Sequence, residues 1–428
     1  MILLLMILAA VSLAVGIPFF ASLVAPVMVA LLLYMPDLSL TIVFHKMFNG
    51  IGQFALLAVP FFIFAAEIVV QGTMARRLID FTRCLVGHLP GGLAMTTIVS
   101  CAFFGAVSGS TQATVAAVGG LMYPAMTASG YPRRFVLGLI VNASDIALLI
   151  PPSISMIIFG VVTGSSVASL FLGGIGPGIV LTLAFMIYAY LRARKFNLPT
   201  TPRAPLAEVG TAFLQTIWGL GVPVIIIGGI YAGIFTPTEA ASVSVVYAIV
   251  VEVAIYRTLT WTDVYRIAAR SATVTGVIFL VIAAASALTW LLIISGLPQT
   301  LSTWVVEHIS SPIRFLLLLN GVLFIACMFI DPISVILISM PIVFPAAQAL
   351  GIDAIHLGIV VVTNIAIGSA TPPFGIDLFT ASSIFNVRFS EVAPGAIPFA
   401  GIAVIGLLIV TYFPSLTLFL PRLLMGLQ

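Results

Sequence analysis

The sequence has 428 residues, of which 61% are hydrophobic and 7% are charged. Soluble globular proteins contain about 25% charged residues, so this composition excludes an ordinary soluble protein. The 16 basic and 13 acidic residues leave a net charge of +3. The basic residues cluster beside apolar runs and form no basic face, so we expect no nucleic-acid partner.

Charge-free apolar runs divide the chain into predicted membrane spans. A run of more than about 18 apolar residues can cross a bilayer. The runs occupy residues 1–36, 84–132, 146–191, 209–238, 271–306 and 392–421. Helices are expected in them, because the alternating segments of about 10 residues that a β-barrel needs are missing. The predicted fold class is an all-α polytopic membrane protein embedded in a lipid bilayer.

The first run lacks a basic leading region and a small-residue cleavage site followed by soluble sequence. We therefore expect a retained first span and not a signal peptide. The three cysteines, Cys84, Cys101 and Cys327, lie in or beside apolar runs without paired spacing. This spacing argues against a disulfide framework or a zinc site.

Residues 73–89 alternate apolar and charged side chains at helical spacing. This pattern predicts an amphipathic helix along the membrane surface, with a solvated connecting loop as the alternative. The next run, 84–132, has arginines at both ends, which places both ends on one side of the membrane. From Gly92 each arm has about 17 residues, or ~25 Å of helix, which is shorter than the ~30 Å hydrocarbon core.

This length predicts a re-entrant hairpin whose tip stops inside the membrane. The tip carries three hydroxyls around a glycine, at Ser108, Gly109, Ser110 and Thr111. Hydroxyls that merely bond to helix carbonyls, as is common in membrane helices, are the alternative interpretation.

A double proline, Pro151 and Pro152, follows in the middle of the next span. It removes two amide donors and pushes the preceding residue out of helical geometry. The free carbonyls become oxygen ligands, and the next half-helix offers a positive N-terminus to an anion. A simple proline kink is the alternative. Asp145 lies in this segment, where an acid is costly unless it meets a cavity, a cation or a partner.

The densest basic loop contains Arg192, Arg194, Lys195 and Arg203, and the positive-inside rule places it in the cytoplasm. Two spans, near 212–235 and 237–256, then return the chain to the cytoplasmic side. Residues 236–239 read as a capping box with proline at the first helical position. One further span after Arg270 leads outward to a second, weaker amphipathic stretch at 299–309.

The second half repeats the first. Residues 345–351 match 124–130, and the double proline at 372–373 matches that at 151–152, with one offset, 345 − 124 = 372 − 151 = 221. A second hairpin is predicted with its tip at Asp331–Ser334. The copies start from opposite sides of the membrane, and inverted repeats with broken helices are typical of secondary transporters. A duplicated bundle without transport is the alternative.

Three other acids lie within or near spans: Glu67, Glu252 and Asp377. Each of them is a candidate proton or cation relay, and a structural acid with satisfied hydrogen bonds is the equally weighted alternative.

Four runs carry a family resemblance: GAVSGSTQATVAAVGGLMYPAM, LLIPPSISMIIFG, GGIYAGIFTPTEAASV and IAIGSATPPFG. In this order and nearly end to end, they resemble the large membrane subunit of tripartite ATP-independent periplasmic (TRAP) transporters, the DctM family. The resemblance implies an elevator-type transporter of the bacterial inner membrane that imports organic acids with a sodium gradient. It also implies two partners, a small membrane subunit of four helices and a periplasmic substrate-binding protein. No cofactor is expected other than sodium as the coupling ion.

Carried over by position, the resemblance predicts a substrate and sodium site formed by the two tips and the two unwound segments. Its residues are Ser108, Gly109, Ser110, Thr111, Asp145, Ala147, Pro151, Asp331, Ser334, Gly368, Ser369, Thr371 and Pro372. Sodium is expected at Ser108, Ser110, Asp331 and Thr371. The sequence departs from the family at 144–147, where a glycine- and threonine-rich run is usual, so Asp145 adds a charge to that half.

The predicted organisation follows from these elements. Scaffold spans at 1–51 precede a first repeat at 52–199, a cytoplasmic linker at 200–211, central scaffold spans at 212–270 and a second repeat at 271–428.

Other functions fit the sequence less well. An intramembrane serine protease needs the motif G-x-S-G, but Ala106 replaces its glycine, and the four histidines fall near predicted membrane edges, so an enzyme is not expected. A channel is disfavoured by two unlike tips. The remaining alternative is a stand-alone sodium-coupled anion symporter of related inverted-repeat fold.

Overall fold

A computed structural model describes residues 1–196, 202–309 and 311–426. These residues form helices and no β-strand, which confirms the all-α prediction. Seven helices in the described part of the chain are long and apolar enough to cross a membrane. Residues 200 and 201, which begin the predicted linker, lie outside the described residues.

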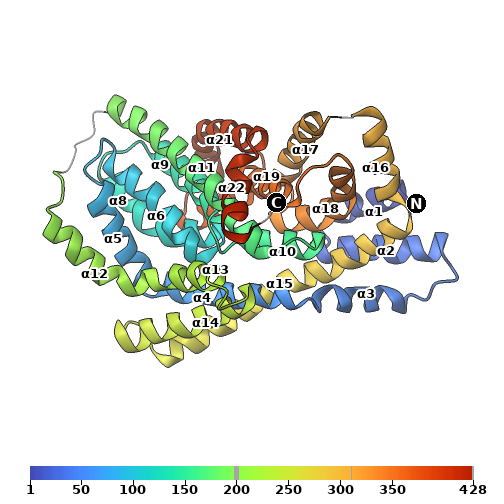
Figure 1. The fold of residues 1–428 in the computed structure, drawn as a ribbon, viewed down its shortest axis with the longest axis horizontal. Coiled ribbons are helices and arrows are strands. Elements are labelled where there is room, and N and C mark those ends of the chain that lie inside the picture. The colour runs from blue at the N-terminus through green and yellow to red at the C-terminus, as the bar shows by residue number, and fades with distance from the viewer. Residues whose placement is uncertain (197–201, 310, 427–428) are drawn as a thin grey trace.

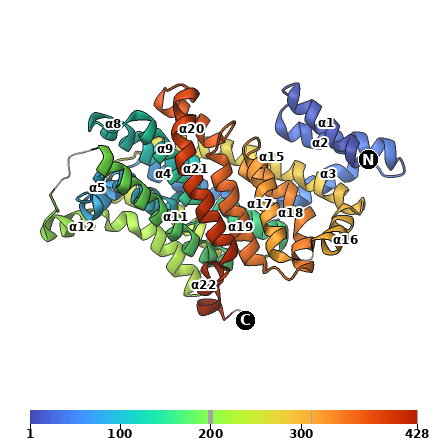
Figure 2. The same cartoon turned by 90° about the horizontal axis from the view of Figure 1, so that it is seen from above.

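The N-terminal part contains α1 (Ile2–Ala14), α2 (Phe19–Tyr34), α3 (Thr41–Ile51), the 3-10 turn η1 (Phe54–Leu57) and α4 (Ala58–Gln71). The apolar run at 1–36 is divided between two helices, α1 and α2. The chain breaks between α1 and α2, where Gly16 has a φ of 85° and Pro18 precedes the second helix. Figure 2 shows α1 and α2 together at one side of the molecule, close to the N-terminus.

Among the described residues, the longest helix is α15 (Trp261–Ile294), whose 34 residues extend ~51 Å. It runs beside α3 and α4 along one edge of the molecule (Figure 1). Gly50 on α3 permits this close approach, because an added Cβ would lie 2.0 Å from the hydroxyl oxygen of Ser286. The row formed by α3, α4 and α15 is called the scaffold wall below.

The first half of the fold follows in chain order: α5 (Met74–Val86), α6 (Gly92–Ser108), α7 (Thr111–Thr114), η2 (Val115–Gly119), α8 (Gly120–Ala128), α9 (Arg133–Ser144), η3 (Asp145–Leu148), α10 (Ile154–Thr163) and α11 (Val167–Phe196). Helix α6 and the arm α7–α8 form the predicted first hairpin. Helices α9 and α10 are the two parts of the predicted broken span.

The second half contains α16 (Leu297–His308), α17 (Pro312–Cys327), α18 (Pro332–Ala349), α19 (Ala354–Ser369), α20 (Ile376–Phe385), α21 (Phe389–Tyr412) and α22 (Ser415–Met425). Its elements begin at positions equivalent to those of the first half. Helix α9 begins at Arg133 and α19 at Ala354, which is again an offset of 354 − 133 = 221. Both double prolines contain a cis peptide bond. The structure thus has the same order of hairpin and broken helix twice.

The central elements are α12 (Leu206–Pro223), η4 (Val224–Gly228), α13 (Gly229–Tyr231), α14 (Pro237–Ile249) and η5 (Val250–Ile255). They form the two predicted central spans. The capping box at the start of α14 is confirmed, since the side chains of Thr236 and Glu239 each bond to the other residue's backbone N–H.

The amphipathic helix predicted at 73–89 is confirmed as α5, which buries its apolar side chains against α6 and α12. Glu252 is fully buried and accepts hydrogen bonds from the backbone N–H groups of Thr73, at 2.9 Å, and Met74, at 2.8 Å. The hydroxyl of Thr258 also donates to it. Of the two interpretations for Glu252, the structure supports a structural acid that caps α5.

Candidate functional site

The tip of the first hairpin is shaped by one glycine. Gly109 ends α6 in the left-handed conformation, with a φ of 58°. An added Cβ would also lie 2.3 Å from the carbonyl oxygen of Pro152, so the tip rests directly on the first double proline. Ser110 then caps α7, accepting a hydrogen bond from the N–H of Ala113 at 3.4 Å. Both strain and close packing therefore require glycine at position 109.

The tip of the second hairpin is built on an acid. Asp331 caps α18, where its carboxylate accepts hydrogen bonds from the backbone N–H of Ser334, at 3.0 Å, and from the Ser334 hydroxyl. Pro332 occupies the first position of the helix. Proline is favoured at this position because its fixed φ suits a helix start and its missing N–H would have no partner there.

The two tips share one cavity of about 480 Å³. The first tip contributes Ser108, Gly109, Ser110, Thr111 and Gln112, and the second contributes Asp331. Further polar side chains from α10, α20 and the scaffold wall complete the lining: Ser155, Thr380, Glu67 and Arg270. The cavity therefore lies between the hairpin tips and the scaffold wall, and it is called the tip cavity below.

The first broken helix lies behind the tip cavity. Asp145 is fully buried, and neither of its carboxylate oxygens has a hydrogen-bond partner among the described residues. Ala147 packs against α6 so closely that a Cβ at Gly105 would lie 2.6 Å from its Cα. Pro151 is buried in the same region. None of these three predicted site residues lines the tip cavity.

The second broken helix is packed against the second hairpin. Gly368 touches α17, because an added Cβ would lie 2.4 Å from the Cβ of Cys327. The hydroxyl of Thr371 donates to the carbonyl of Ile367 at 2.6 Å, and this side chain does not line the tip cavity. Pro372 is half-buried and also lies outside the cavity lining. Of the four residues expected to bind sodium, Ser108, Ser110 and Asp331 therefore share a cavity and Thr371 lies apart.

Asp377 joins the two halves of the site. Its carboxylate accepts one hydrogen bond from the hydroxyl of Thr111 and one from the hydroxyl of Ser369, both at 2.7 Å. All three side chains are at most 1% exposed. The first hairpin tip is thus tied to the second broken helix through a buried acid, although 266 residues separate Thr111 from Asp377.

Sequence reasoning singled out Asp377 as an intramembrane acid but gave it no place in the site. The spacing of Ser369 and Asp377, eight residues apart across a double proline, held no signal of their contact. Arg270 was assigned only to a cytoplasmic basic group, because the charge-free run begins at the following residue. The structure instead places its helix, α15, along the tip cavity.

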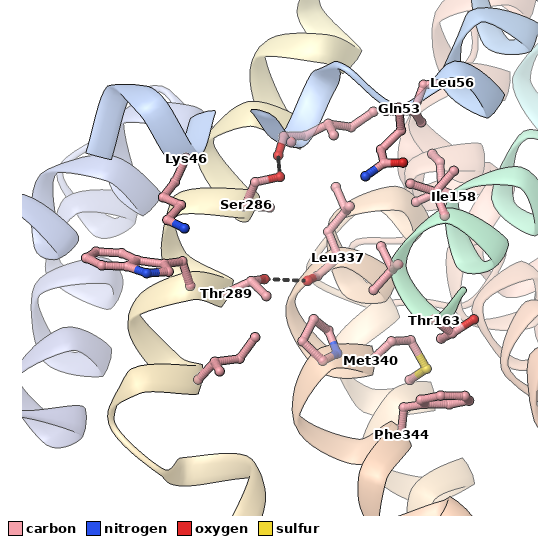
Figure 3. A pocket seen from close by; sticks show the side chains of 18 of the residues that line it. Lys46, Gln53, Leu56, Ile158, Thr163, Ser286, Thr289, Leu337, Met340 and Phe344 are labelled. Atoms are coloured by element: carbon pink, nitrogen blue, oxygen red, sulfur yellow. Dashed lines mark hydrogen bonds between the residues drawn. The ribbon is translucent and has the colours of Figure 1, made fainter. Parts of the chain in front are cut away.

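A second cavity, of about 420 Å³, lies between the scaffold wall and helices α10 and α18 (Figure 3). Lys46, Gln53, Ser286 and Thr289 contribute polar groups from the scaffold side. The hydroxyl of Thr289 reaches across to the carbonyl of Leu337 through a long hydrogen bond of 3.5 Å. Both cavities thus lie at the boundary between the scaffold wall and the elements that carry the hairpins.

No group of three or more His, Cys, Asp or Glu side chains that could hold a metal ion occurs in the described ranges. The polar groups of the tip cavity are hydroxyl, amide and carboxylate oxygens and one guanidinium. This set suits a hard monovalent cation and a small charged solute, and it offers no nucleophile with an adjacent base.

Comparison with known proteins gives the family. Residues 5–416 match the tripartite ATP-independent periplasmic transporter, DctM component. The large permease protein of an ectoine/5-hydroxyectoine TRAP transporter from Ruegeria pomeroyi is 44% identical over 412 residues, which cover 96% of each chain.

Two further relatives cover nearly the same length. The ectoine TRAP transporter large permease protein of Halomonas elongata is 44% identical over 88% of this chain and 92% of the relative. The C4-dicarboxylate TRAP transporter large permease protein of Pseudomonas aeruginosa is 42% identical over 92% of each chain. The resemblance predicted from four motifs is confirmed: this chain belongs to the DctM family of TRAP transporter membrane subunits, and it is a multi-pass membrane protein and not an enzyme.

Proposed function

We propose that this chain is the large permease subunit of a sodium-driven importer that takes a small carboxylate-bearing solute from a periplasmic substrate-binding protein. The observation that carries the proposal is the tip cavity, in which two hairpin tips from the two repeats face one space. In secondary transporters with inverted repeats, substrate and ion sites form at such discontinuous helices.

Sodium fits the donor set of the tip cavity. The hydroxyls of Ser108 and Ser110 and the carboxylate of Asp331 are hard oxygen ligands in a common space. Thr371, the fourth expected ligand, lies behind the cavity, where its hydroxyl hydrogen is donated to Ile367 and its oxygen lone pairs remain available. Each carboxylate oxygen of Asp331 accepts one hydrogen bond from Ser334, and each keeps a further lone pair for a cation.

The proposed movement is of the elevator type. The hairpins and broken helices would move as a unit against the scaffold wall, since the Thr111–Asp377–Ser369 hydrogen bonds join them to each other. The boundary with the scaffold wall is instead interrupted by two cavities. Such a boundary opposes sliding less than a fully packed one does, because packed interiors resist displacement.

The proposed location is the bacterial inner membrane, with the basic ends of α5 and α11 in the cytoplasm. The partners would be a small membrane subunit and a periplasmic binding protein, in keeping with the tripartite family. The relatives named above transport ectoine or C4-dicarboxylates according to their names, and these solutes share a carboxylate group. An organic acid is therefore the proposed substrate class.

Uptake into proteoliposomes tests this function. The chain is reconstituted with its small subunit, and a panel of labelled organic acids is offered with the binding protein and a sodium gradient each added or withheld. Uptake that needs both supports a tripartite symporter. Uptake without the binding protein would instead indicate a stand-alone sodium-coupled symporter.

The sodium site has its own test. Ser110→Ala and Thr371→Ala should each raise the sodium concentration for half-maximal uptake, because each removes one oxygen ligand. Unchanged sodium dependence in both variants would contradict the ligand assignment.

A further inference from the structure

The scaffold side of the tip cavity carries two opposite charges. Glu67 comes from α4 and is half-buried, and its carboxylate accepts a hydrogen bond of 3.2 Å from the side chain of Gln71. Arg270 comes from α15 and is exposed at the cavity. The ion pairs in the described part of the chain join Arg133 to Glu391 and Arg266 to Asp263. Neither Glu67 nor Arg270 takes part in an ion pair with another described residue, and both remain available to a solute.

The tip cavity has three charged side chains in its lining. Its lining contains two carboxylates, Glu67 and Asp331, and one guanidinium, Arg270. Under the proposed function, sodium neutralises Asp331. The remaining charges are then one negative group and one positive group, both on the scaffold wall and both facing the hydroxyl-bearing tips.

A solute with one charge of each sign complements this pair. The planar guanidinium of Arg270 can hold a carboxylate through two parallel hydrogen bonds. The carboxylate of Glu67 can accept hydrogen bonds from a cation. A dicarboxylate would place its second carboxylate near Glu67 without a cation opposite it, and such juxtaposition of like charges in a partly desolvated site rejects a ligand.

We propose that Glu67 and Arg270 select a small zwitterion, which carries one carboxylate and one cationic group. The inference rests on the proposed function and names its substrate class. A cavity of about 480 Å³ lies within the size range of sites for small molecules. Glu67 and Arg270 act as specificity-determining residues of the scaffold wall, while the hairpin tips hold the coupling ion.

Direct binding tests the inference without the selectivity of the binding protein. The purified pair of this chain and its small subunit, in sodium-containing buffer, is titrated by calorimetry with ectoine as a zwitterion and with succinate as a dicarboxylate. Wild-type protein should bind ectoine at least tenfold more tightly than succinate. Glu67→Gln should weaken ectoine binding about 10- to 100-fold, because a hydrogen-bonded charge partner is lost, and should not weaken succinate binding.

Arg270→Gln should weaken the binding of both solutes, because both present a carboxylate. Arg266→Gln is the matched control on α15, since Arg266 pairs with Asp263 and does not line the tip cavity. Glu307→Gln is the control for removal of an exposed acid from α16. Both controls should bind ectoine as the wild type does.

Two results would overturn the inference. One is wild-type protein that binds succinate as tightly as ectoine, or that binds neither. The other is a Glu67→Gln variant with unchanged ectoine affinity. Uptake of succinate that depends on sodium and on the binding protein would overturn the zwitterion assignment while supporting the proposed function. Uptake of ectoine that is independent of sodium would support the zwitterion assignment and contradict the sodium-driven function.

Discussion

The hydrogen bond between Thr111 and Asp377 links the two repeats through a buried acid, and Thr111→Val tests it. Valine keeps the shape of threonine and removes the hydroxyl that donates to Asp377 at 2.7 Å. Hydrogen bonds to charged groups contribute about 1.5–3 kcal/mol, and the acid is fully buried. We expect the free energy of unfolding to fall by about 2 kcal/mol, because the fully buried Asp377 loses one of its two hydroxyl donors.

The assay is denaturation of the purified protein in detergent, followed by circular dichroism. Thr127→Val is the control in the same hairpin, where the hydroxyl bonds only to carbonyls of its own helix, those of Tyr123 and Pro124. Its loss should cost less than about 1 kcal/mol. Ser369→Ala removes the second donor, and the double variant should show coupling of at least ~0.5 kcal/mol because both bonds share one carboxylate. Equal destabilisation by Thr111→Val and Thr127→Val would refute the assignment of Asp377 as a cross-repeat link.

Three further predictions follow from the buried contacts. Glu252→Gln should lower the free energy of unfolding by about 1–3 kcal/mol and leave the sodium dependence of uptake unchanged, since this acid caps a helix. A changed sodium dependence would instead support the interpretation of Glu252 as a cation relay. Gly109→Ala should abolish uptake, whereas Gly130→Ala, which also has positive φ but open space around it, should only cost stability; equal uptake by the two variants would refute the close packing of the first tip. Ser334→Ala should raise the sodium concentration for half-maximal uptake, because the carboxylate of Asp331 loses its hydroxyl donor, and an unchanged value would separate Asp331 from the ion site.

The sequence predicted the order of helices because its strongest signals are local. Charge-free runs, the double prolines and the amphipathic stretch at 73–89 each depend on neighbouring residues, and each matches an element of the structure. The common offset of 221 residues located the second hairpin and second broken helix from the first. The break within the first run was not predicted, because hydropathy does not distinguish one long span from two short helices separated by Gly16 and Pro18.

The site could be predicted only in part. Both tips were located, because hydroxyls or an acid in the middle of an apolar run are costly and therefore informative. Which of those residues line the same cavity depends on tertiary contacts, and the spacing of residues along the sequence does not predict such contacts. Arg270 enters the tip cavity because α15 runs along it, and Asp377 enters the network because its helix packs beside the first tip.

These contacts decide which parts of the molecule can move together. Thr111 both lines the tip cavity and donates to Asp377, which in turn accepts from Ser369 on the second broken helix. Displacing the first tip without the second half would break a charge-assisted hydrogen bond in a buried site, at a cost of about 1.5–3 kcal/mol. Displacing both halves together past the scaffold wall breaks only the long bond from Thr289 among the hydrogen bonds described at the second cavity. Under the proposed elevator movement, the energetically easier motion is therefore that of both hairpins as one body, with Glu67 and Arg270 staying on the scaffold wall.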